Sequence, residues 1–484
     1  MARNTDPQPQ STRRDFLWKN ACAALTLTGI ATTVRDLRLI NAAAADNIRA
    51  AAKPKASGGS IKPATSSSNY KALVCIFLFG GNDGNNLLVP TDTATFTRYA
   101  AARGVLALSQ PGTSGGPLAL NPLSNDGHTY GINPAMPEIQ TLFNSGQAAL
   151  LANVGTLLAP LTRTQYLNQS VATPAQLFSH NDQQVEWQTS SEDETIPTGW
   201  GGRTADLLYS LNTSNTVSMN ISLAGSNTFQ TGNTVNAYSV SENGAIALVN
   251  AAPQQAVLQN LLNMSHPNLY EGAFAQQMNT AISDAGLLNA AIAPTAASNY
   301  WTTPFPITDI GFQLKMIARL IQAAPTFGHN RQIFFASMGG FDLHGGEGTA
   351  NGAQYNLLQQ LSEAMNALYQ ATEQIGVSAS VTQFTASDFS RTLPANSSLG
   401  ADHGWGSHHI ILGGSVVGQN IYGTYPTLQV NGPDDTSTGR WIPTTAVDQY
   451  AATLAKWFGV SATNMTTVLP YIGRFATADL GFMG

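Results

Sequence analysis

The segment from Val381 to Gly414 carries the densest set of residues that could bind a cation. Two aspartates and three histidines fall within 22 positions, and the whole chain has 8 histidines. They are Asp388, Asp402, His403, His408 and His409. Carboxylate and imidazole groups are common ligands of divalent cations, and clusters of them are costly to hold together without an ion or a reaction. The alternative is a set of ordinary surface histidines and loop aspartates; the clustering favours a metal or catalytic site.

Other candidate ligands follow apolar runs elsewhere in the chain. The run Ala72–Phe79 leads into Asp83, and the strand predicted over residues 332–336 leads into Asp342 and His344. Parallel strands place their carboxyl ends at one edge of a sheet, where ligands bind. We therefore expect these residues to converge with Asp388 on one pocket. Read alone, Asp83 is equally compatible with a turn.

Ser179 precedes a predicted helix start in the stretch FSHNDQQ at 178–184. A serine at such a position can present its hydroxyl beside free backbone N–H groups, which suits a nucleophile. The same position also favours an ordinary helix N-cap. Arg203 and Arg391 are candidates for holding an oxyanion.

The elements that position these residues indicate an α/β domain. Apolar runs alternate with stretches of helical periodicity, such as Ile310, Leu314, Ile317 and Ile321; this alternation is typical of a mostly parallel sheet flanked by helices. We predict a single domain over residues 70–484, with a small β and helical insertion at about 206–300 that frames the substrate.

The N-terminal region has the order of an export signal. Arg13 and Arg14 precede an apolar run over residues 21–34 and an alanine-rich end at 42–45. This order is typical of a twin-arginine signal, and its apolar run is too short for a stable membrane span. An amphipathic first helix is the alternative. We predict a signal over 1–45, a flexible linker over 46–69, the twin-arginine translocase as a partner, and a periplasmic or secreted protein.

Composition agrees with export and excludes one class of partner. The formal charge is −6, and residues 1–45 carry six basic and three acidic residues, so the remainder carries −6 − 3 = −9. A chain this acidic, without a basic patch, is not expected to bind nucleic acid. Cys22 lies in the predicted signal and Cys75 in an apolar run, so no disulfide is expected within the exported form.

Several motifs together resemble one family. They are GGNDGNNLLVP at 80–90, FSHNDQQ at 178–184, TGWGGR at 198–203, GGFDLHGG at 339–346, SDFSRT at 387–392 and DHGWGSHHIILGG at 402–414. In this order they look like the domain of unknown function 1501 family, whose members are exported and are grouped with sulfatases and alkaline phosphatases. The resemblance implies that superfamily's α/β fold and a site for one or two divalent cations.

The resemblance also implies roles for single residues. Ser179 would be the nucleophile and Arg391 or Arg203 would hold a non-bridging oxygen of the ester. The implied ligands are Asp83, Asp342, His344, Asp388, Asp402, His403, His408 and His409, with Asp402 as a ligand or as a partner that orients His403. The cation would be Zn, Mn, Mg or Ca.

The substrate implied is a small-molecule or glycan ester of phosphate or sulfate. The chain has no Cys-x-Pro-x-Arg sequence of the kind that sulfatases convert to formylglycine, which favours a serine mechanism. The alternative is a non-catalytic exported protein that keeps the fold and binds an envelope component or polymer.

Overall fold

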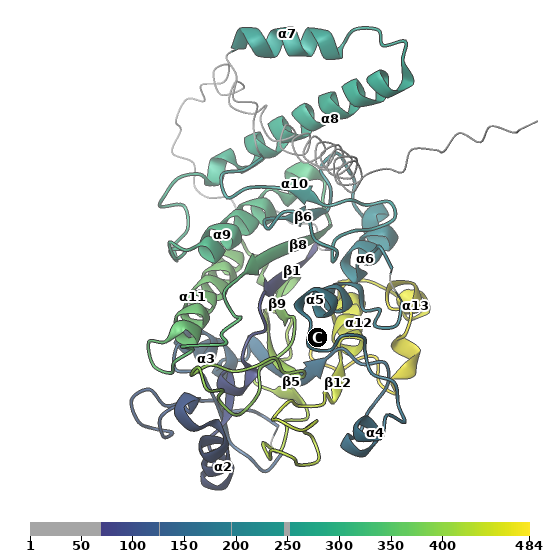
Figure 1. Cartoon of the computed structure of the whole chain (residues 1–484). Helices are drawn as coiled ribbons and strands as arrows, with labels where there is room; N and C mark the ends of the chain where they lie inside the picture. The colour runs from purple at the N-terminus through teal and green to yellow at the C-terminus, as the bar shows by residue number, and fades with distance from the viewer. Residues whose placement is uncertain (1–68, 125, 195, 246–251) are drawn as a thin grey trace, which may run out of the picture. The chain divides into compact units, whose positions relative to one another are not determined.

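The computed structural model describes residues 69–124, 126–194, 196–245 and 252–484 (Figure 1). The predicted signal and nearly all of the predicted linker lie outside these residues. The chain divides into two compact units, one formed by residues 57–244 and 291–484 and the other containing residues 245–290. The first unit holds all of the candidate site residues.

A nine-stranded mixed sheet forms the centre of the larger unit. Its strand order is β11-β5-β10-β9-β1-β8-β6-β7, with β12 paired to β5. The strands are β1 Lys71–Leu78, β5 Ala148–Gly155, β6 Asn220–Ser222, β7 Tyr238–Ser239, β8 Arg331–Met338, β9 Val381–Ser387, β10 Ser407–Gly413, β11 Ile421–Gly423 and β12 Thr445–Ala446. Most neighbours are parallel, and β10 runs antiparallel to both β9 and β5. The predicted α/β class with a mostly parallel central sheet is confirmed.

The register places three strand ends side by side. Leu78, the last residue of β1, is opposite Met338 of β8 and Ser387 of β9. The loops that carry Asp83, Asp342 and Asp388 therefore leave the sheet at one edge. Because β10 is antiparallel, the loop that precedes it reaches this edge as well.

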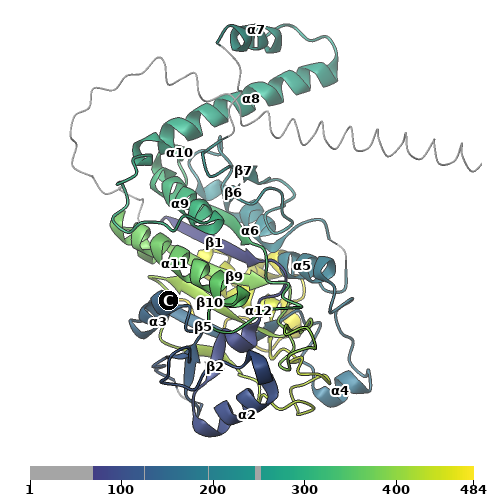
Figure 2. The same cartoon turned by 60° about the vertical axis from the view of Figure 1, so that its left-hand side comes forward.

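Helices cover both faces of the sheet (Figures 1 and 2). One face carries α3 Pro137–Asn144, α9 Asp309–Gln322 and α11 Ala353–Gln374, and α11 contacts both of the others. The other carries α5 His180–Thr189, α6 Trp200–Leu208 and α12 Val447–Phe458. Short helices α4 Arg163–Leu167, α10 Ala324–Phe327 and α13 Met465–Val468 complete the layers, and α2 Thr93–Arg103 packs beside a small sheet. That sheet has the order β2 Leu88–Pro90, β4 Tyr130–Ile132, β3 Leu118–Ala119.

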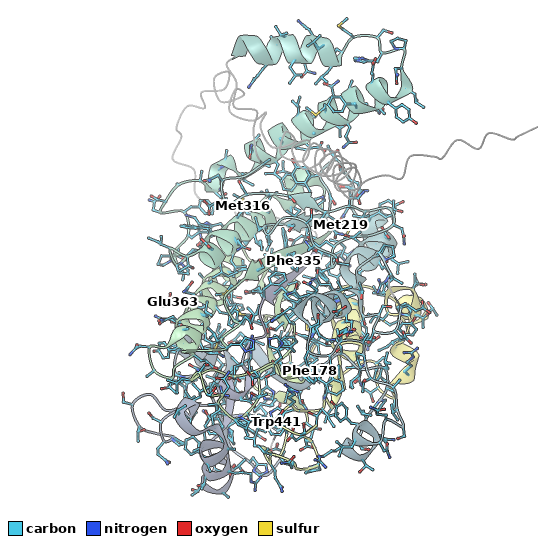
Figure 3. The ribbon with its side chains drawn as sticks, viewed as in Figure 1. Phe178, Met219, Met316, Phe335, Glu363 and Trp441 are labelled. Atoms are coloured by element: carbon cyan, nitrogen blue, oxygen red, sulfur yellow. The ribbon has the colours of Figure 1, made fainter. Side chains whose placement is uncertain are left out.

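The strands are almost wholly buried because they have apolar side chains on both faces. Cys75 and Phe77 of β1 belong to one core cluster with Trp187, Trp200 and Phe335. Phe335 and Met219 lie in this interior (Figure 3). Their neighbours along β1 point to the opposite face, as the alternation of a strand requires. This buried double-sided packing makes the sheet edge a rigid support for the loops.

The range 206–300, predicted as an insertion, holds elements of two kinds. β6 and β7 lie in it and extend the central sheet beside β8. The helices α7 Ala252–Leu262 and α8 Leu269–Ile292 come next, and α7 packs on α8 through Leu262, Ala275 and Met278. None of the described helices is both long and apolar enough to cross a membrane.

Candidate metal centre

One buried guanidinium holds the loops at the sheet edge together. Arg391, just past β9, donates from Nε to the carbonyl of Gly81 at 2.9 Å, and from Nη2 to the carbonyls of Gly80 and Phe341. Its Nη1 donates to the carbonyl of Ala401 at 3.2 Å. The side chain is 0% exposed. Arg391 therefore fixes the loops that follow β1 and β8 and the loop that precedes β10.

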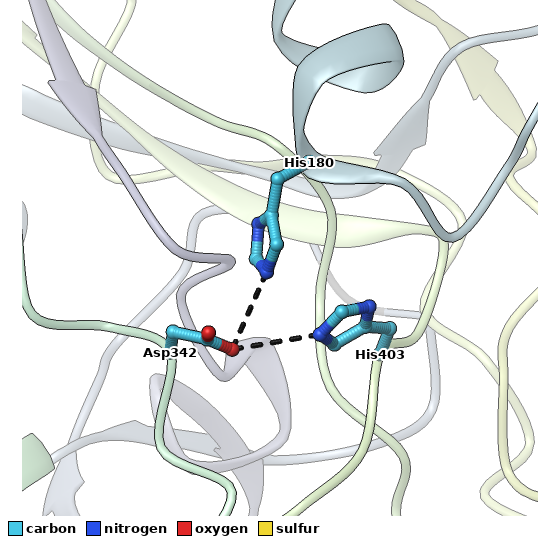
Figure 4. A group of neighbouring side chains, drawn as sticks. All are labelled: His180, Asp342 and His403. Atoms are coloured by element: carbon cyan, nitrogen blue, oxygen red, sulfur yellow. Dashed lines mark ion pairs between the residues drawn. The ribbon is translucent and has the colours of Figure 1, made fainter. Parts of the chain in front are cut away.

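The carboxylate of Asp342 lies at the centre of a group of imidazoles (Figure 4). Its Oδ1 is 3.1 Å from Nε2 of His344, 3.3 Å from Nε2 of His180 and 3.5 Å from Nε2 of His403. Arg391 donates to the same oxygen at 2.6 Å. The Nε2 atoms of His344 and His403 are 2.8 Å apart. Three ring nitrogens and one carboxylate oxygen therefore point at a common place.

The other ring nitrogen of each histidine faces a hydrogen-bond acceptor. Nδ1 of His180 is 2.6 Å from Oδ2 of Asp388, and Nδ1 of His403 is 2.7 Å from the carbonyl oxygen of Phe178. Nδ1 of His344 is 3.4 Å from Oδ1 of Asp402. With a cation bound, a proton on Nδ1 of each ring would satisfy these acceptors and leave the lone pair of each Nε2 for the ion. This is the arrangement that orients histidines toward a metal ion.

Asp388 and Asp402 lie behind the candidate ligands, on the Nδ1 side of His180 and His344. Asp388 is buried and also accepts from Nε2 of Gln184 at 2.9 Å and from the backbone N–H of Gly80. Asp402 is half exposed and accepts from Nδ2 of Asn396 at 3.0 Å. The structure thus gives both aspartates an orienting position.

The electrostatics favour an ionised carboxylate at Asp342 and a neutral ring at His403. Burial alone would raise the pKa of Asp342, but the hydrogen bond and charge of Arg391 lower it overall. Burial lowers the pKa of His403. The hydrogen bond to Asp388 raises the pKa of His180, so a cation and a proton would compete for its Nε2.

The group has one open side. The side chains of Asp342 and His344 are 48% and 47% exposed, whereas those of His180 and His403 are 26% and 20% exposed. Within the described residues, His180, Asp342 and His403 form the set whose ligand atoms lie within 4.8 Å of one another, and His344 adds a fourth donor beside them. A cation held there would keep a position open to solvent.

Asp83 has partners of its own, although its strand ends at the same edge. Its carboxylate forms an ion pair with the buried Arg103, which also contacts Oε1 of Glu347 at 3.0 Å. Its Oδ1 accepts from the backbone N–H of Asn85 at 2.9 Å and caps a short helical turn. The carboxylate of Asp83 therefore pairs with a buried arginine and caps a turn.

His408 and His409 stand inside the sheet. Nδ1 of His408 accepts from the backbone N–H of Asn153 at 3.1 Å, and its ring stacks on Tyr425. The ring of His409 packs against Tyr450 and Trp187. Burial lowers the pKa of both imidazoles to about 3. Both are neutral core residues of β10 in this structure.

Ser179 takes the N-cap position of α5, between Phe178 and His180, which both belong to the site. Its hydroxyl donates to Oδ2 of Asp182 at 2.5 Å. Arg203 lies elsewhere and donates to the carbonyls of Val468, Thr198 and Thr189. Ser179 was predicted from the sequence as a site residue, whereas its neighbour His180, which belongs to the candidate ligand group, was not.

His180 and Gln184 are the members that sequence reasoning missed. They are four residues apart on α5, and so share one face of the helix. The available signal was a histidine and an amide at this spacing in the stretch FSHNDQQ, beside a sheet edge.

Comparison with known proteins adds a family and a distant likeness of structure. A sulfatase from Pseudoalteromonas sp., PsFucS1, matches with a TM-score of 0.30 and 9% sequence identity, over 88% of this chain and 71% of that chain. No curated protein matches the sequence. The family model "Protein of unknown function (DUF1501)" matches residues 70–466. The chain therefore belongs to the DUF1501 family.

Proposed function

We propose that this protein is an exported, metal-dependent hydrolase of phosphate or sulfate esters. The observation that carries the proposal is the convergence of Nε2 of His180, His344 and His403 on Oδ1 of Asp342, with each Nδ1 directed to an acceptor. The ester class itself rests on the resemblance of the motifs to the DUF1501 family, which is grouped with sulfatases and alkaline phosphatases, and export rests on the N-terminal sequence.

Among Zn, Mn, Mg and Ca, the donor set favours Zn²⁺. Imidazole nitrogens suit zinc, whereas Ca²⁺ and Mg²⁺ prefer ligands that are all oxygen. A bound zinc ion with an open position would polarise an ester oxygen and lower the pKa of a bound hydroxyl or water. The exposed side of Asp342 and His344 is where a substrate would approach.

The residues around the ion would have separate tasks. Arg391 holds the ligand Asp342 in place, and Asp388 fixes the ring of His180. The hydroxyl of Ser179, one residue before a ligand, would attack phosphorus or sulfur and pass its proton to Asp182, its present hydrogen-bond partner. The ester alcohol would leave with that proton, and water would later hydrolyse the ester formed on Ser179, which releases the acid and restores the hydroxyl.

One observation favours a second candidate, a non-catalytic metal-binding protein. The guanidinium of Arg391 donates hydrogen bonds to four backbone carbonyls, and that of Arg203 donates to three. Neither is available to hold the oxygens of a phosphate or sulfate group. A binder of an envelope component would need only the metal and the open side.

Metal analysis combined with turnover tests both candidates. Purified exported protein should contain about one zinc ion per chain and hydrolyse 4-nitrophenyl phosphate or sulfate. His403→Ala should lose both, whereas His128→Ala, a change at a half-exposed histidine away from the group, should keep both. One ion without turnover supports the binder, and a protein that binds no divalent transition metal refutes both candidates.

A further inference from the structure

Arg440 lies beside the candidate ligand His403, on the loop between β11 and β12. Its Nε donates to the carbonyl oxygen of His403 at 2.7 Å. Its guanidinium lies over the ring of Phe178, with Cζ 4.2 Å from the ring centroid. The carbonyl oxygen of Phe178 in turn faces Nδ1 of His403 at 2.7 Å. Arg440 therefore contacts both a candidate ligand and the residue that orients its ring.

A buried aspartate fixes the loop that carries Arg440. Oδ1 of Asp435 accepts from the backbone N–H groups of Gly439 and Arg440, at 2.9 Å each. Asp435 is 0% exposed, and the backbone N–H of Thr436 donates to the carbonyl of Arg440 at 3.0 Å. The position of Arg440 is thus set before a ligand binds, which reduces the cost of binding one.

The two Nη nitrogens of Arg440 are free to bind a ligand. Within the described residues, neither has a hydrogen-bond or ion-pair partner, and Nε alone is used. Stacking on Phe178 occupies the face of the guanidinium, so the donors at its edge stay available. Arg391 and Arg203, by contrast, use every guanidinium nitrogen on backbone carbonyls. A planar pair of N–H donors matches two oxygens of a phosphate or sulfate group.

The charge of Arg440 belongs to the open side of the ligand group. Arg440 is partly exposed, and the side chains of Asp402 and His344 are about half exposed. The hydrogen bond from Asn396 is the main cause that lowers the pKa of Asp402, and the charge of Arg440 lowers it further without a direct ion pair. The chain after residue 45 has a net charge of −9. An anionic ester therefore needs a local positive group where it approaches.

We propose that Arg440 holds the non-bridging oxygens of the substrate's phosphate or sulfate group. This assignment rests on the proposed function, because it takes the ion of the candidate metal centre as the second group that binds the ester. Phe178, on which Arg440 stacks, directly precedes Ser179. The Nη donors would stabilise the negative charge on those oxygens as the Ser179 hydroxyl attacks. Arg440 would thus supply the anion contact that Arg391 and Arg203 do not.

Binding of inorganic anions tests this assignment without requiring turnover. Isothermal titration calorimetry of the purified, zinc-loaded protein should show one site per chain for inorganic phosphate or, in a separate titration, for sulfate. The anion that binds more tightly identifies the ester. Arg440→Gln should weaken this binding about 10–100-fold at unchanged zinc content, because hydrogen bonds to a charged group are lost.

Two further variants show whether the effect is specific. Arg440→Lys keeps the positive charge but not the planar pair of donors, so its affinity should fall between those of the wild type and Arg440→Gln. Arg98→Gln changes an exposed arginine of α2 that donates to the carbonyl of Thr427, and should bind the anion as the wild type does.

Chemical labelling tests the same contact in the wild-type protein. Phenylglyoxal modifies accessible arginines, and peptide mass spectrometry locates the products. At a concentration of the bound anion about ten times its Kd, labelling of Arg440 should slow about tenfold, whereas labelling of Arg98 should not change. This measurement decides the question even where Arg440→Gln loses zinc or fails to fold.

The outcomes separate this assignment from the proposed hydrolase. Equal anion binding by Arg440→Gln and the wild type, or unprotected Arg440, would overturn the assignment even where the wild type hydrolyses esters. A wild-type protein that binds neither anion would overturn it as well. Anion binding through Arg440 without turnover would support the contact and count against the hydrolase.

Discussion

At the scale of single residues, Asp388 determines how His180 presents its Nε2. The carboxylate accepts from Nδ1 at 2.6 Å inside a buried site. Asp388→Asn removes the charge and places an amide there, which no longer enforces the ring tautomer. We predict that zinc affinity falls about 10–100-fold, measured by competition with a chromophoric chelator.

Asp402→Asn provides the comparison for that experiment. Asp402 is half exposed and lies 3.4 Å from Nδ1 of His344, so the same chemical change should have a smaller effect. Equal losses in the two variants would show that burial and hydrogen-bond length at Asp388 do not matter for the metal.

The role of the Ser179 hydroxyl can be tested separately from that of the candidate metal ligands. It contacts Asp182 at 2.5 Å and takes no part in the ligand group. Ser179→Ala should therefore keep the zinc content and lose ester turnover. Turnover and metal content of the same preparation check this. Undiminished turnover would assign the attack to water instead of the serine.

Much of the candidate site could be predicted from residue types that follow strands. Asp342, His344 and His403 lie together because their loops leave one edge of the sheet. Asp83 leaves the same edge but is paired with Arg103, a residue on a helix that no local pattern links to it. Pairing between distant charges depends on tertiary packing, which residue spacing does not record.

At the scale of elements, Arg103 joins α2 to the loops that follow β1 and β8. Its guanidinium lies between the buried carboxylates of Asp83 and Glu347. Arg103→Met would leave those charges without compensation, and we predict a loss of about 3–5 kcal/mol in the free energy of unfolding. Denaturant unfolding measures it.

Arg98→Met on the same helix is the matched control. Arg98 is exposed and donates to the carbonyl of Thr427, so its replacement should cost less than about 1 kcal/mol. A similar cost at both positions would mean that the buried network does not stabilise α2.

Buried histidines in the sheet layer should make the protein sensitive to acid. Burial lowers the pKa of His329 from 6.5 to about 4, and those of His408 and His409 to about 3. Between these values and 6.5 the unfolded chain binds more protons than the folded one, so stability is fully present above about pH 6.5 and falls with decreasing pH.

His329→Gln should flatten this dependence by about 1–3 kcal/mol between pH 6.5 and pH 4. Unfolding free energies across this pH range test it, with His128→Gln at a half-exposed site as the control. An unchanged slope in His329→Gln would contradict the assignment of a neutral buried ring.

Strand existence was easier to predict than strand order. The apolar run at 72–79 and the strand expected at 332–336 correspond closely to β1 and β8. The antiparallel placement of β10 between β9 and β5 has no signal in local hydrophobicity, because pairing partners are chosen by the packing of both faces. β6 and β7, at the far side of the sheet, are too short to show a period.

At the scale of the whole molecule, the part of the chain that the structure describes folds without a disulfide. Cys75 is a free, buried residue of β1. The larger unit is held by a two-sided core and by buried arginines such as Arg391 that join loops distant in sequence. A domain built in this way does not need an oxidising compartment to fold, which is compatible with the proposed export of a folded protein.

The twin-arginine signal is the remaining whole-molecule prediction. The translocase for folded proteins reads two adjacent guanidinium groups, and lysine does not reproduce their planar set of donors. Replacing Arg13 and Arg14 together by Lys should leave the precursor in the cytoplasm, as measured by fractionation and immunoblotting. Replacing Arg35 and Arg38 by Lys makes the same number of equal changes in the same segment, and should leave export intact. Export of the first variant at the normal level would refute the signal and, with it, the periplasmic or secreted location.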